Sequence, residues 1–254
     1  MLAVVSPAKK LNTDENERSL SYTQPSLLTD TEQLVQTTKT LGPSDLQSLM
    51  GISEKLANLN HTRFQDFNTP FTEANAKAAA LMFNGDTYVG LDAHTLSKES
   101  LEWAQDHLAI LSGLYGILRP LDLIQPYRLE MGTRLKTARG KSLYEFWGVR
   151  ITKQIQAQLG SHKNPTLVNL ASNEYFKSVQ VKALPGQVLT PAFKEIRDGK
   201  PKMISFMAKK ARGMMARYII DNRVEEPEGL KQFDGGGYTY APELSDNATW
   251  TFTR

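Results

Sequence analysis

The first ten residues, Met1–Lys10 (MLAVVSPAKK), decide the expected fold. The apolar run Leu2–Val5 predicts a buried strand, because four consecutive apolar residues without polar alternation are typical of a strand covered on both faces. A Ser-Pro turn follows, and it carries Lys9 and Lys10. Lysines just beyond the carboxyl end of a strand commonly hold an anion in α/β sheets. The opening segment therefore predicts an α/β protein with a candidate ligand-binding turn.

Composition excludes several classes of protein. The opening apolar run is too short for a signal sequence and has no basic residues before it, and no apolar run approaches the roughly 18–20 residues that span a bilayer. A cytoplasmic protein without membrane contact is expected. Absence of cysteine excludes disulfides, thiolate zinc sites and cysteine-ligated iron–sulfur clusters. The four histidines are scattered, so neither a metal site nor a cofactor is expected; they are His61, His94, His107 and His162.

The remaining periodicity predicts a mixed α/β (α+β) fold in a single compact domain spanning residues 1–254, with a central mixed sheet and surrounding helices. Helices are expected within 27–60, 72–83, 97–111, 141–159 and 207–221. Strands are expected at 86–91, 166–170, 187–193, 202–206, 238–241 and 249–252. Residues 12–26 are polar and are expected to form a loop. Within 27–60, Gly42–Asp45 predicts a helix stop and a new helix start, and Ser53 predicts a further cap.

Charge is unevenly distributed along the chain, although the net charge is only +3. Residues 1–118 carry 8 basic and 14 acidic side chains, residues 119–217 carry 19 and 6, and residues 218–254 carry 3 and 7. The central block therefore has a net charge of +13. A block of this size favours a polyanionic partner if the fold gathers it on one surface. The alternative is an ordinary solvated surface.

The segment Met207–Asp221 is predicted to form a basic amphipathic helix. At about 100° per residue, its cations share one arc and its apolar residues face the other way. These cations are Lys209, Lys210, Arg212 and Arg217. Gly213 lies within the cationic arc, although glycine costs about 1 kcal/mol relative to alanine inside a helix. We expect this glycine to allow close approach of a phosphate backbone.

Two glycines, Gly113 and Gly116, bracket an apolar pair before Arg119. This pattern resembles the hairpin of a helix-hairpin-helix motif, expected over about 97–125, in which glycine N–H groups bind phosphate without reading bases. The hairpin has one residue more than the usual spacing. A plain turn that requires glycine for positive φ is the alternative interpretation.

Polar residues also follow the predicted strand 166–170, and they allow a catalytic hypothesis. Glu174 is a candidate acid or base, and Lys9 or Lys209 could bind phosphate or form a Schiff base. Ser172 and Asn173 have the simpler interpretation of helix caps. A deep pocket joining these residues would favour an enzyme acting on a nucleic acid or a small phosphorylated molecule, whereas a shallow groove would favour DNA binding.

Five segments together resemble the bacterial YaaA peroxide-stress resistance family. They are Ser6–Lys9 (SPAK), Leu111–Asp122 (LSGLYGILRPLD), Gln125–Gly132 (QPYRLEMG), Asn169–Val179 (NLASNEYFKSV) and Ile204–Gly213 (ISFMAKKARG). The resemblance implies a role in the hydrogen peroxide stress response that limits free iron and oxidative DNA damage. It also implies sequence-nonspecific binding of duplex and branched DNA through a basic cleft, on an α/β fold with a helix-hairpin-helix element.

The resemblance places DNA contacts at the glycine hairpin and the basic helix. The full set of expected DNA-binding residues is Lys9, Gly113, Gly116, Arg119, Arg128, Lys177, Lys209, Lys210, Arg212 and Arg217. The chain offers too few ligands for iron, so any effect on iron is expected to be indirect. A non-catalytic protein is expected, with the enzyme as the alternative.

Overall fold

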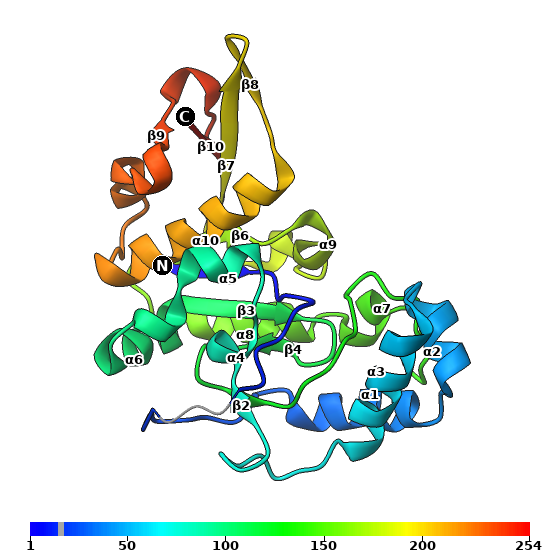
Figure 1. Ribbon diagram of the computed structural model, residues 1–254. Helices are drawn as coiled ribbons and strands as arrows, with labels where there is room; N and C mark the ends of the chain where they lie inside the picture. The colour runs from blue at the N-terminus through cyan, green and yellow to red at the C-terminus, as the bar shows by residue number, and fades with distance from the viewer. Residues whose placement is uncertain (15–17) are drawn as a thin grey trace.

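Strand β1 (Leu2–Val5) lies in the interior of an eight-stranded mixed sheet in the computed structural model, which describes residues 1–14 and 18–254 (Figure 1). Its parallel neighbours are β3 (Leu108–Ser112) and β6 (Leu167–Leu170). From β6 the sheet continues through the parallel strands β7 (Val188–Arg197) and β10 (Thr249–Thr253). Every residue of β1 is buried, so the strand predicted from the opening segment is confirmed.

Short antiparallel strands complete the sheet. β4 (Gly116–Leu118) pairs with β3, β8 (Lys200–Lys202) pairs with β7, and β9 (Thr239–Tyr240) pairs with β10. A separate two-stranded sheet joins β2 (Lys77–Ala78) to β5 (Leu123–Ile124). The mixed α/β class is confirmed, as are the strands expected near 166–170, 187–193, 238–241 and 249–252.

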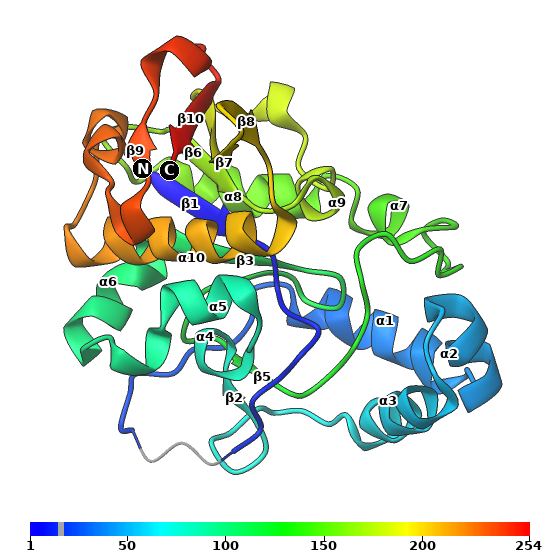
Figure 2. The ribbon, with the colours of Figure 1, turned by 45° about the horizontal axis from the view of Figure 1, so that its top comes forward.

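Helices cover both faces of the sheet. α6 (Lys98–His107) and α10 (Ser205–Asp221) both contact β1, and α5 (Asp86–Leu91) packs along α10. α8 (Arg150–Leu159) lies on the opposite side of the sheet from α10 in both ribbon views (Figure 2). Strands β1, β3 and β6 are therefore buried along their whole length, which explains their mainly apolar sequences.

Helices α1 (Leu28–Lys39), α2 (Pro43–Met50) and α3 (Glu54–Asp66) form a layer at one side of the molecule (Figure 1). The predicted stop and restart at Gly42–Asp45 is confirmed, because the Gly42 N–H donates to the Asp45 carboxylate at 2.9 Å. Ser53 caps α3 as expected: its Oγ accepts from the Leu56 N–H. The short helices are α4 (Ala79–Met82), α7 (Leu143–Trp147) and α9 (Asn173–Phe176). Single 3-10 turns occur at Ala93–Thr95, Val181–Ala183, Pro227–Gln232, Gly235–Gly237 and Pro242–Leu244.

The helix expected over 97–111 ends at His107, four residues early. Leu108–Leu111 is instead part of β3, and β3 turns back antiparallel into β4. A short buried apolar run suits a helix or a strand equally, and here pairing with β1 decides. Residues 98–118 therefore form a helix followed by a β-hairpin, in place of the expected helix-hairpin-helix element.

Two neighbouring predictions are reversed. Residues 86–91 form helix α5 rather than a strand. Residues 72–83 form a turn, the strand β2 and the single-turn helix α4 rather than one alanine-rich helix. Pairing of β2 with β5 overrides the helix propensity of the alanines, and packing along α10 overrides the alternation of 86–91.

Three further segments differ in detail. The helix expected over 141–159 is divided into α7 and α8 at Gly148, whose φ is +51°. The strand expected at 202–206 retains only Lys202, because α10 begins at Ser205. In the loop expected at 12–26, residues 15–17 lie outside the described part of the chain, and the others belong to no helix or ladder strand. None of the described helices is long and apolar enough to cross a bilayer.

Candidate functional site

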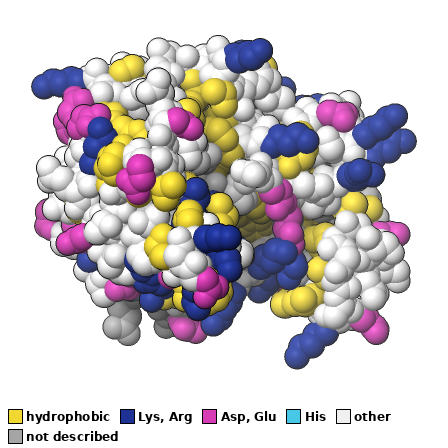
Figure 3. Space-filling model, turned by 90° about the horizontal axis from the view of Figure 1, so that it is seen from above, with side chains coloured by type: hydrophobic (Ala, Val, Ile, Leu, Met, Phe, Trp, Pro, Cys, Tyr) yellow, Lys and Arg dark blue, Asp and Glu magenta, His cyan; other side chains and the backbone are white. Residues whose placement is uncertain are grey.

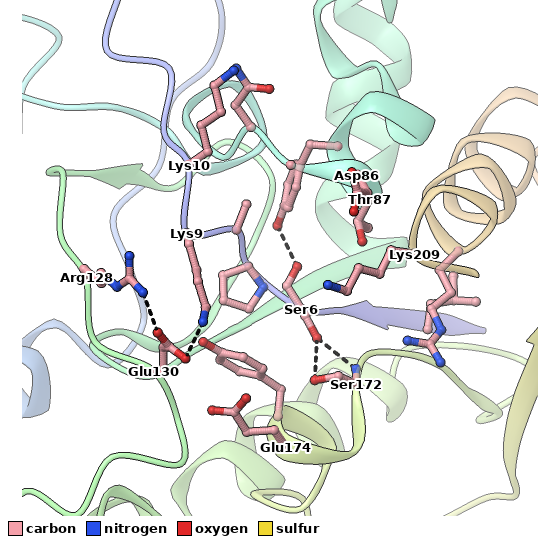
Figure 4. A pocket seen from close by; sticks show the side chains of 18 of the residues that line it. Ser6, Lys9, Lys10, Asp86, Thr87, Arg128, Glu130, Ser172, Glu174 and Lys209 are labelled. Carbon is pink, nitrogen blue, oxygen red and sulfur yellow. Dashed lines mark hydrogen bonds and ion pairs between the residues drawn. The ribbon is translucent and has the colours of Figure 1, made fainter. Parts of the chain in front are cut away.

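A pocket of about 470 Å³ opens at the carboxyl ends of β1 and β6 (Figure 4). Ser6–Lys10 reach it from β1, and Ser172–Tyr175 reach it from the segment after β6. Lys209 and Arg212 enter from α10. After β1 the chain next enters the sheet at β3 on one side, whereas β6 lies on the other side. In an open α/β sheet, a ligand usually binds where the chain leaves neighbouring strands toward opposite sides of the sheet in this way.

Hydrogen bonds between three elements form the floor of the pocket. The Ser172 N–H donates to Ser6 Oγ at 2.8 Å, and Ser6 Oγ donates to Ser172 Oγ at 3.3 Å. The Tyr88 hydroxyl donates to the Ser6 carbonyl at 3.0 Å and so fixes α5 to the end of β1. Ser172 occupies the N-cap position of α9 but makes no capping hydrogen bond with its side chain. Its hydroxyl accepts a hydrogen bond from Ser6 on the pocket floor and does not accept one from the backbone of α9.

Lys9, Glu130 and Arg128 form a closed ionic cluster on one wall (Figure 4). Glu130 accepts from Lys9 Nζ at 2.9 Å and from an Arg128 terminal nitrogen at 3.2 Å. The Lys9 side chain is 62% exposed, unlike the desolvated lysines that form Schiff bases. In this arrangement Lys9 is better suited to holding a charge than to covalent catalysis.

Glu174 stands on the same side of the pocket. Its Oε1 accepts from the Gly132 N–H at 2.9 Å, and its backbone carbonyl accepts from the Tyr144 hydroxyl at 2.8 Å. This pocket brings together the three residues that the sequence analysis considered for catalysis, Lys9, Glu174 and Lys209.

The opposite wall carries cations without anionic partners. Among residues 1–14 and 18–254, neither a carboxylate nor a hydrogen-bonding group pairs with the side chains of Lys209, Lys210 or Arg212. Lys209 points into the pocket beside Ser6 (Figure 4). Arg212 also lines the pocket and is half-buried, and burial lowers the pKa of its guanidinium. Lys210 is exposed and does not line the pocket.

Tyrosines contribute to the pocket wall without adding charge. Tyr127 and Tyr175 are buried, and burial raises the pKa of both phenols well above the ordinary value of about 10. Both therefore remain neutral at physiological pH. Electrostatics in the pocket are set by its lysines, arginines and carboxylates.

Gly213 does not face the pocket or solvent, contrary to the expectation of phosphate approach. It is buried against α5, where a Cβ added to it would lie 1.8 Å from the Thr87 carbonyl oxygen. The glycine is required by helix packing, which the helical wheel alone could not reveal because both sides of α10 are partly covered.

Gly113 and Gly116 are also buried. A Cβ at Gly113 would lie 2.2 Å from the Leu129 carbonyl oxygen, and the Gly113 carbonyl accepts from Trp147 Nε1 at 3.0 Å. Gly116 has a φ of +71°, as a tight β-hairpin requires. Neither glycine presents its N–H group on the surface, so we omit both from the proposed DNA-binding surface.

Five of the other eight expected DNA-binding residues have partners, and two of these, Lys9 and Arg128, pair with Glu130. Arg119 pairs with Asp122 at 3.3 Å, and Lys177 lies 5.2 Å from the centre of the Tyr144 ring. Arg217 pairs with Asp221 at 2.7 Å and donates to the Asp92 carbonyl at 2.9 Å. Asp221 is the last residue of α10 and lies four positions after Arg217, at the helical spacing of an ion pair.

The β7–β8 hairpin is a feature that the sequence analysis missed. It projects from the molecule above the start of α10 (Figure 1) and carries three exposed cations, Arg197, Lys200 and Lys202. Both residues of its turn, Asp198 and Gly199, have positive φ. The Asp-Gly dipeptide between two strand-like runs is the sequence signal that could have identified it.

The surface around the pocket is hollowed, and Lys and Arg side chains stand around the hollow with carboxylates among them (Figure 3). Within the described residues, no three His, Cys, Asp or Glu side chains come together as a group that could hold a metal ion. The site is therefore a cation-rich pocket with exposed basic side chains beside it.

These features define a mixed α/β protein with a basic pocket at the carboxyl edge of its sheet. Residues 1–244 match the family described as "Peroxide stress protein YaaA". The chain is 54% identical to UPF0246 proteins of Alteromonas mediterranea and Saccharophagus degradans, over all of this chain and 98% and 99% of theirs. It is 50% identical to a UPF0246 protein of Aliivibrio fischeri, over all of this chain and 98% of that one. The chain belongs to the YaaA family of peroxide stress proteins, which confirms the resemblance seen in its sequence.

Proposed function

We propose that this peroxide stress protein binds DNA through the phosphate backbone without reading base sequence, and thereby limits oxidative damage to DNA. The observation that carries this proposal is the pair of exposed lysines Lys209 and Lys210 on α10, which have no partner among residues 1–14 and 18–254. A lysine without a local carboxylate retains its full charge for an external anion. Phosphate contacts of this kind supply affinity but no sequence information.

The β7–β8 hairpin extends the same basic surface. β8 ends three residues before α10 begins, so Lys200 and Lys202 precede Lys209 and Lys210 along one continuous segment. Lys202 pairs only loosely with the exposed Asp198, at 3.6 Å. A projecting basic hairpin beside a basic helix can contact phosphates on more than one strand. Duplex and branched DNA both present phosphates on several strands that run in different directions.

The proposal is tested by fluorescence anisotropy with labelled duplex and four-way-junction DNA over a series of salt concentrations. Binding should weaken steeply with salt, with log K falling by about 0.9 per contacted phosphate for each tenfold increase. The variant Lys210→Ala should reduce this slope by about 0.9, and Arg197→Ala with Lys200→Ala should reduce it further. Lys55→Ala serves as the control, because Lys55 is an exposed lysine on the distant helix α3. Absence of binding at low salt would refute the proposal.

A second candidate is an enzyme that acts on a nucleic acid or on a small phosphorylated molecule. The specific observation in its favour is the pocket itself, because it joins Lys9, Glu174 and Lys209 in a volume of about 470 Å³. Incubation with nucleotides and sugar phosphates, followed by phosphorus NMR, tests this candidate. Turnover that Glu174→Gln abolishes would establish it, and unchanged spectra across the substrates would reject it.

A further inference from the structure

We propose that the α10 wall of the pocket is a binding site for the dianionic phosphate of a small phosphomonoester, held by Arg212 and Lys209 beside Ser6. This inference shares Lys209 with the proposed DNA surface, but its ligand and its test do not require DNA, since Arg212 lines the pocket and Lys210 lies outside it. It rests on the pocket of the second candidate function and names its ligand, without requiring that the ligand react.

The first support is the isolation of Arg212. Its guanidinium is half-buried in the pocket wall, and within the described residues no carboxylate or hydrogen-bonding group meets it. The other arginine that lines the pocket is Arg128, and it has a carboxylate partner, because it pairs with Glu130 at 3.2 Å. Withdrawing a cation from water without a partner is unfavourable. An incoming anion would supply the missing partner.

The second support is the engagement of two of the three carboxylates that could otherwise neutralise this wall. Glu130 is held between Lys9 and Arg128, and Glu174 accepts from the Gly132 N–H. Both lie across the pocket from Lys209 (Figure 4). Glu130 and Glu174 are therefore separated from Lys209 within the pocket, whereas Asp86, on α5, lies nearer to it.

The third support is the balance of charge. Five cations and three carboxylates line the pocket, a net charge of +2. The cations are Lys9, Lys10, Arg128, Lys209 and Arg212, and the carboxylates are Asp86, Glu130 and Glu174. A phosphomonoester carries about −1.5 to −2 near pH 7, whereas a backbone phosphodiester carries −1. The monoester matches the pocket more closely.

The shape of the pocket indicates that the phosphate is attached to an organic group. A volume of about 470 Å³ is typical of small-molecule sites and exceeds what a phosphate ion requires. Pro7, Tyr127, Leu129 and Leu170 also line the pocket and provide apolar surface. This part of the pocket would hold the remainder of the ester.

Hydroxyl groups complete the phosphate site. Ser6 Oγ and Ser172 Oγ stand at the floor beside the Lys209 side chain (Figure 4). Ser6 donates its proton to Ser172 Oγ, and the proton of Ser172 is left for a phosphate oxygen. Two positive side chains with one neutral hydroxyl form a set of donors suited to three phosphate oxygens.

The test uses titration calorimetry of the full chain with methyl phosphate, ribose 5-phosphate, inorganic phosphate and dimethyl phosphate. The monoesters should bind at least tenfold more tightly than dimethyl phosphate, and ribose 5-phosphate more tightly than inorganic phosphate. Affinity should rise between about pH 5.5 and pH 7, as the second phosphate proton with a pKa of about 6 is lost. Arg212→Gln should weaken monoester binding at least tenfold, Arg212→Lys should retain part of it, and Lys55→Gln should leave it unchanged.

Thermal unfolding provides an independent readout. Arg212→Gln removes a half-buried cation that has no partner among the described residues, so this variant should be at least as stable as the native chain without ligand. Ribose 5-phosphate should raise the Tm of the native chain and leave that of Arg212→Gln unchanged. Equal binding of dimethyl phosphate, or monoester binding unaffected by Arg212→Gln, would overturn the inference. Failure of DNA binding with intact monoester binding would reject only the proposed function.

Discussion

Gly90 on α5 and Gly213 on α10 lie in the contact between these two helices. A Cβ at Gly90 would lie 2.1 Å from the Lys210 carbonyl oxygen, and one at Gly213 would lie 1.8 Å from the Thr87 carbonyl oxygen. Neither distance is compatible with a side chain. The contact fixes α10 against α5, and it thereby directs Lys209 and Arg212 toward the pocket.

The variant Gly213→Ala distinguishes two roles for this glycine, helix packing and close approach of a phosphate. The two roles predict opposite signs for the change in the free energy of unfolding. At an open helical surface, alanine would stabilise the fold by about 1 kcal/mol. Against Thr87 it should instead destabilise the fold by about 1–3 kcal/mol or more, as overpacking does. Urea denaturation measures the difference. Gly160→Ala is the control, because Gly160 has helical φ and ψ and its added Cβ would have ordinary clearance of 3.4 Å.

Arg217→Gln should reduce stability without changing the salt dependence of DNA binding. The Arg217 guanidinium donates to Asp92 O at 2.9 Å and to Thr95 Oγ1 at 2.7 Å, besides pairing with Asp221. Loss of hydrogen bonds from a charged donor costs about 1.5–3 kcal/mol. Lys210→Ala should show the opposite pattern, with stability retained and the salt slope reduced. A reduced slope in Arg217→Gln would return this arginine to the interface.

Arg254→Met should destabilise the closing strands. Arg254 Nε lies 3.0 and 3.1 Å from the two oxygens of Glu195, which is only 7% exposed and also accepts from the Tyr238 hydroxyl. Burial and this hydrogen bond raise the pKa of Tyr238 to about 12. Leaving the carboxylate without its cation should cost about 1.5–3 kcal/mol.

A double-mutant cycle checks this pair. Glu195→Gln added to Arg254→Met should recover part of the lost stability, because the buried charge is then removed. Arg197 lies on β7, the strand that also carries Glu195, but its side chain is exposed. Arg197→Met should therefore change stability little. Additive losses in the double variant would contradict the coupling.

Stability should fall as the pH drops below about 6.5, with His107 as one cause. His107 stacks on Trp103 at 3.5 Å, and its Nδ1 donates to the Trp103 carbonyl at 2.9 Å. Burial lowers the pKa of His107, against a smaller opposing effect of Glu225. The unfolded chain therefore takes up this proton at a higher pH than the folded chain. The stabilisation that comes from the neutral imidazole is present in full above about pH 6.5. It is lost as the pH falls toward the pKa of His107 in the folded chain.

Thermal unfolding between pH 7.5 and pH 5.5 tests this dependence. The Tm of the native chain should fall over this range, and the fall should be smaller in His107→Gln. His162 lies edge-on to His107, and burial also lowers its pKa, so it should account for part of the remainder. His94→Gln, a change at an exposed position, should keep the native pH dependence. An identical pH profile in His107→Gln would exclude His107 as the cause.

The sequence alone was sufficient wherever a local signal had one physical solution. Leu2–Val5 was correctly predicted as a covered strand, and Ser53 and Gly42–Asp45 start their helices through bonds that span three residues. The basic helix was also predicted, because its pattern extends over several turns. Since Ser6 and Lys9 follow β1 directly, the side of the sheet that carries the pocket was predicted as well.

Only the tertiary structure decided the meaning of the glycines and the pairing of the charges. Gly213, Gly113 and Gly116 have the same local signature whether a phosphate or a packed backbone lies opposite, and that neighbour comes from a distant segment. Likewise, Lys9 pairs with Glu130 only because the sheet assembles residues more than 100 positions apart, and the same assembly leaves Arg212 without an anion in the described part of the chain. Local sequence determines which side chains exist and how each element begins, whereas the free charge of a site depends on partners that the folded chain brings to it.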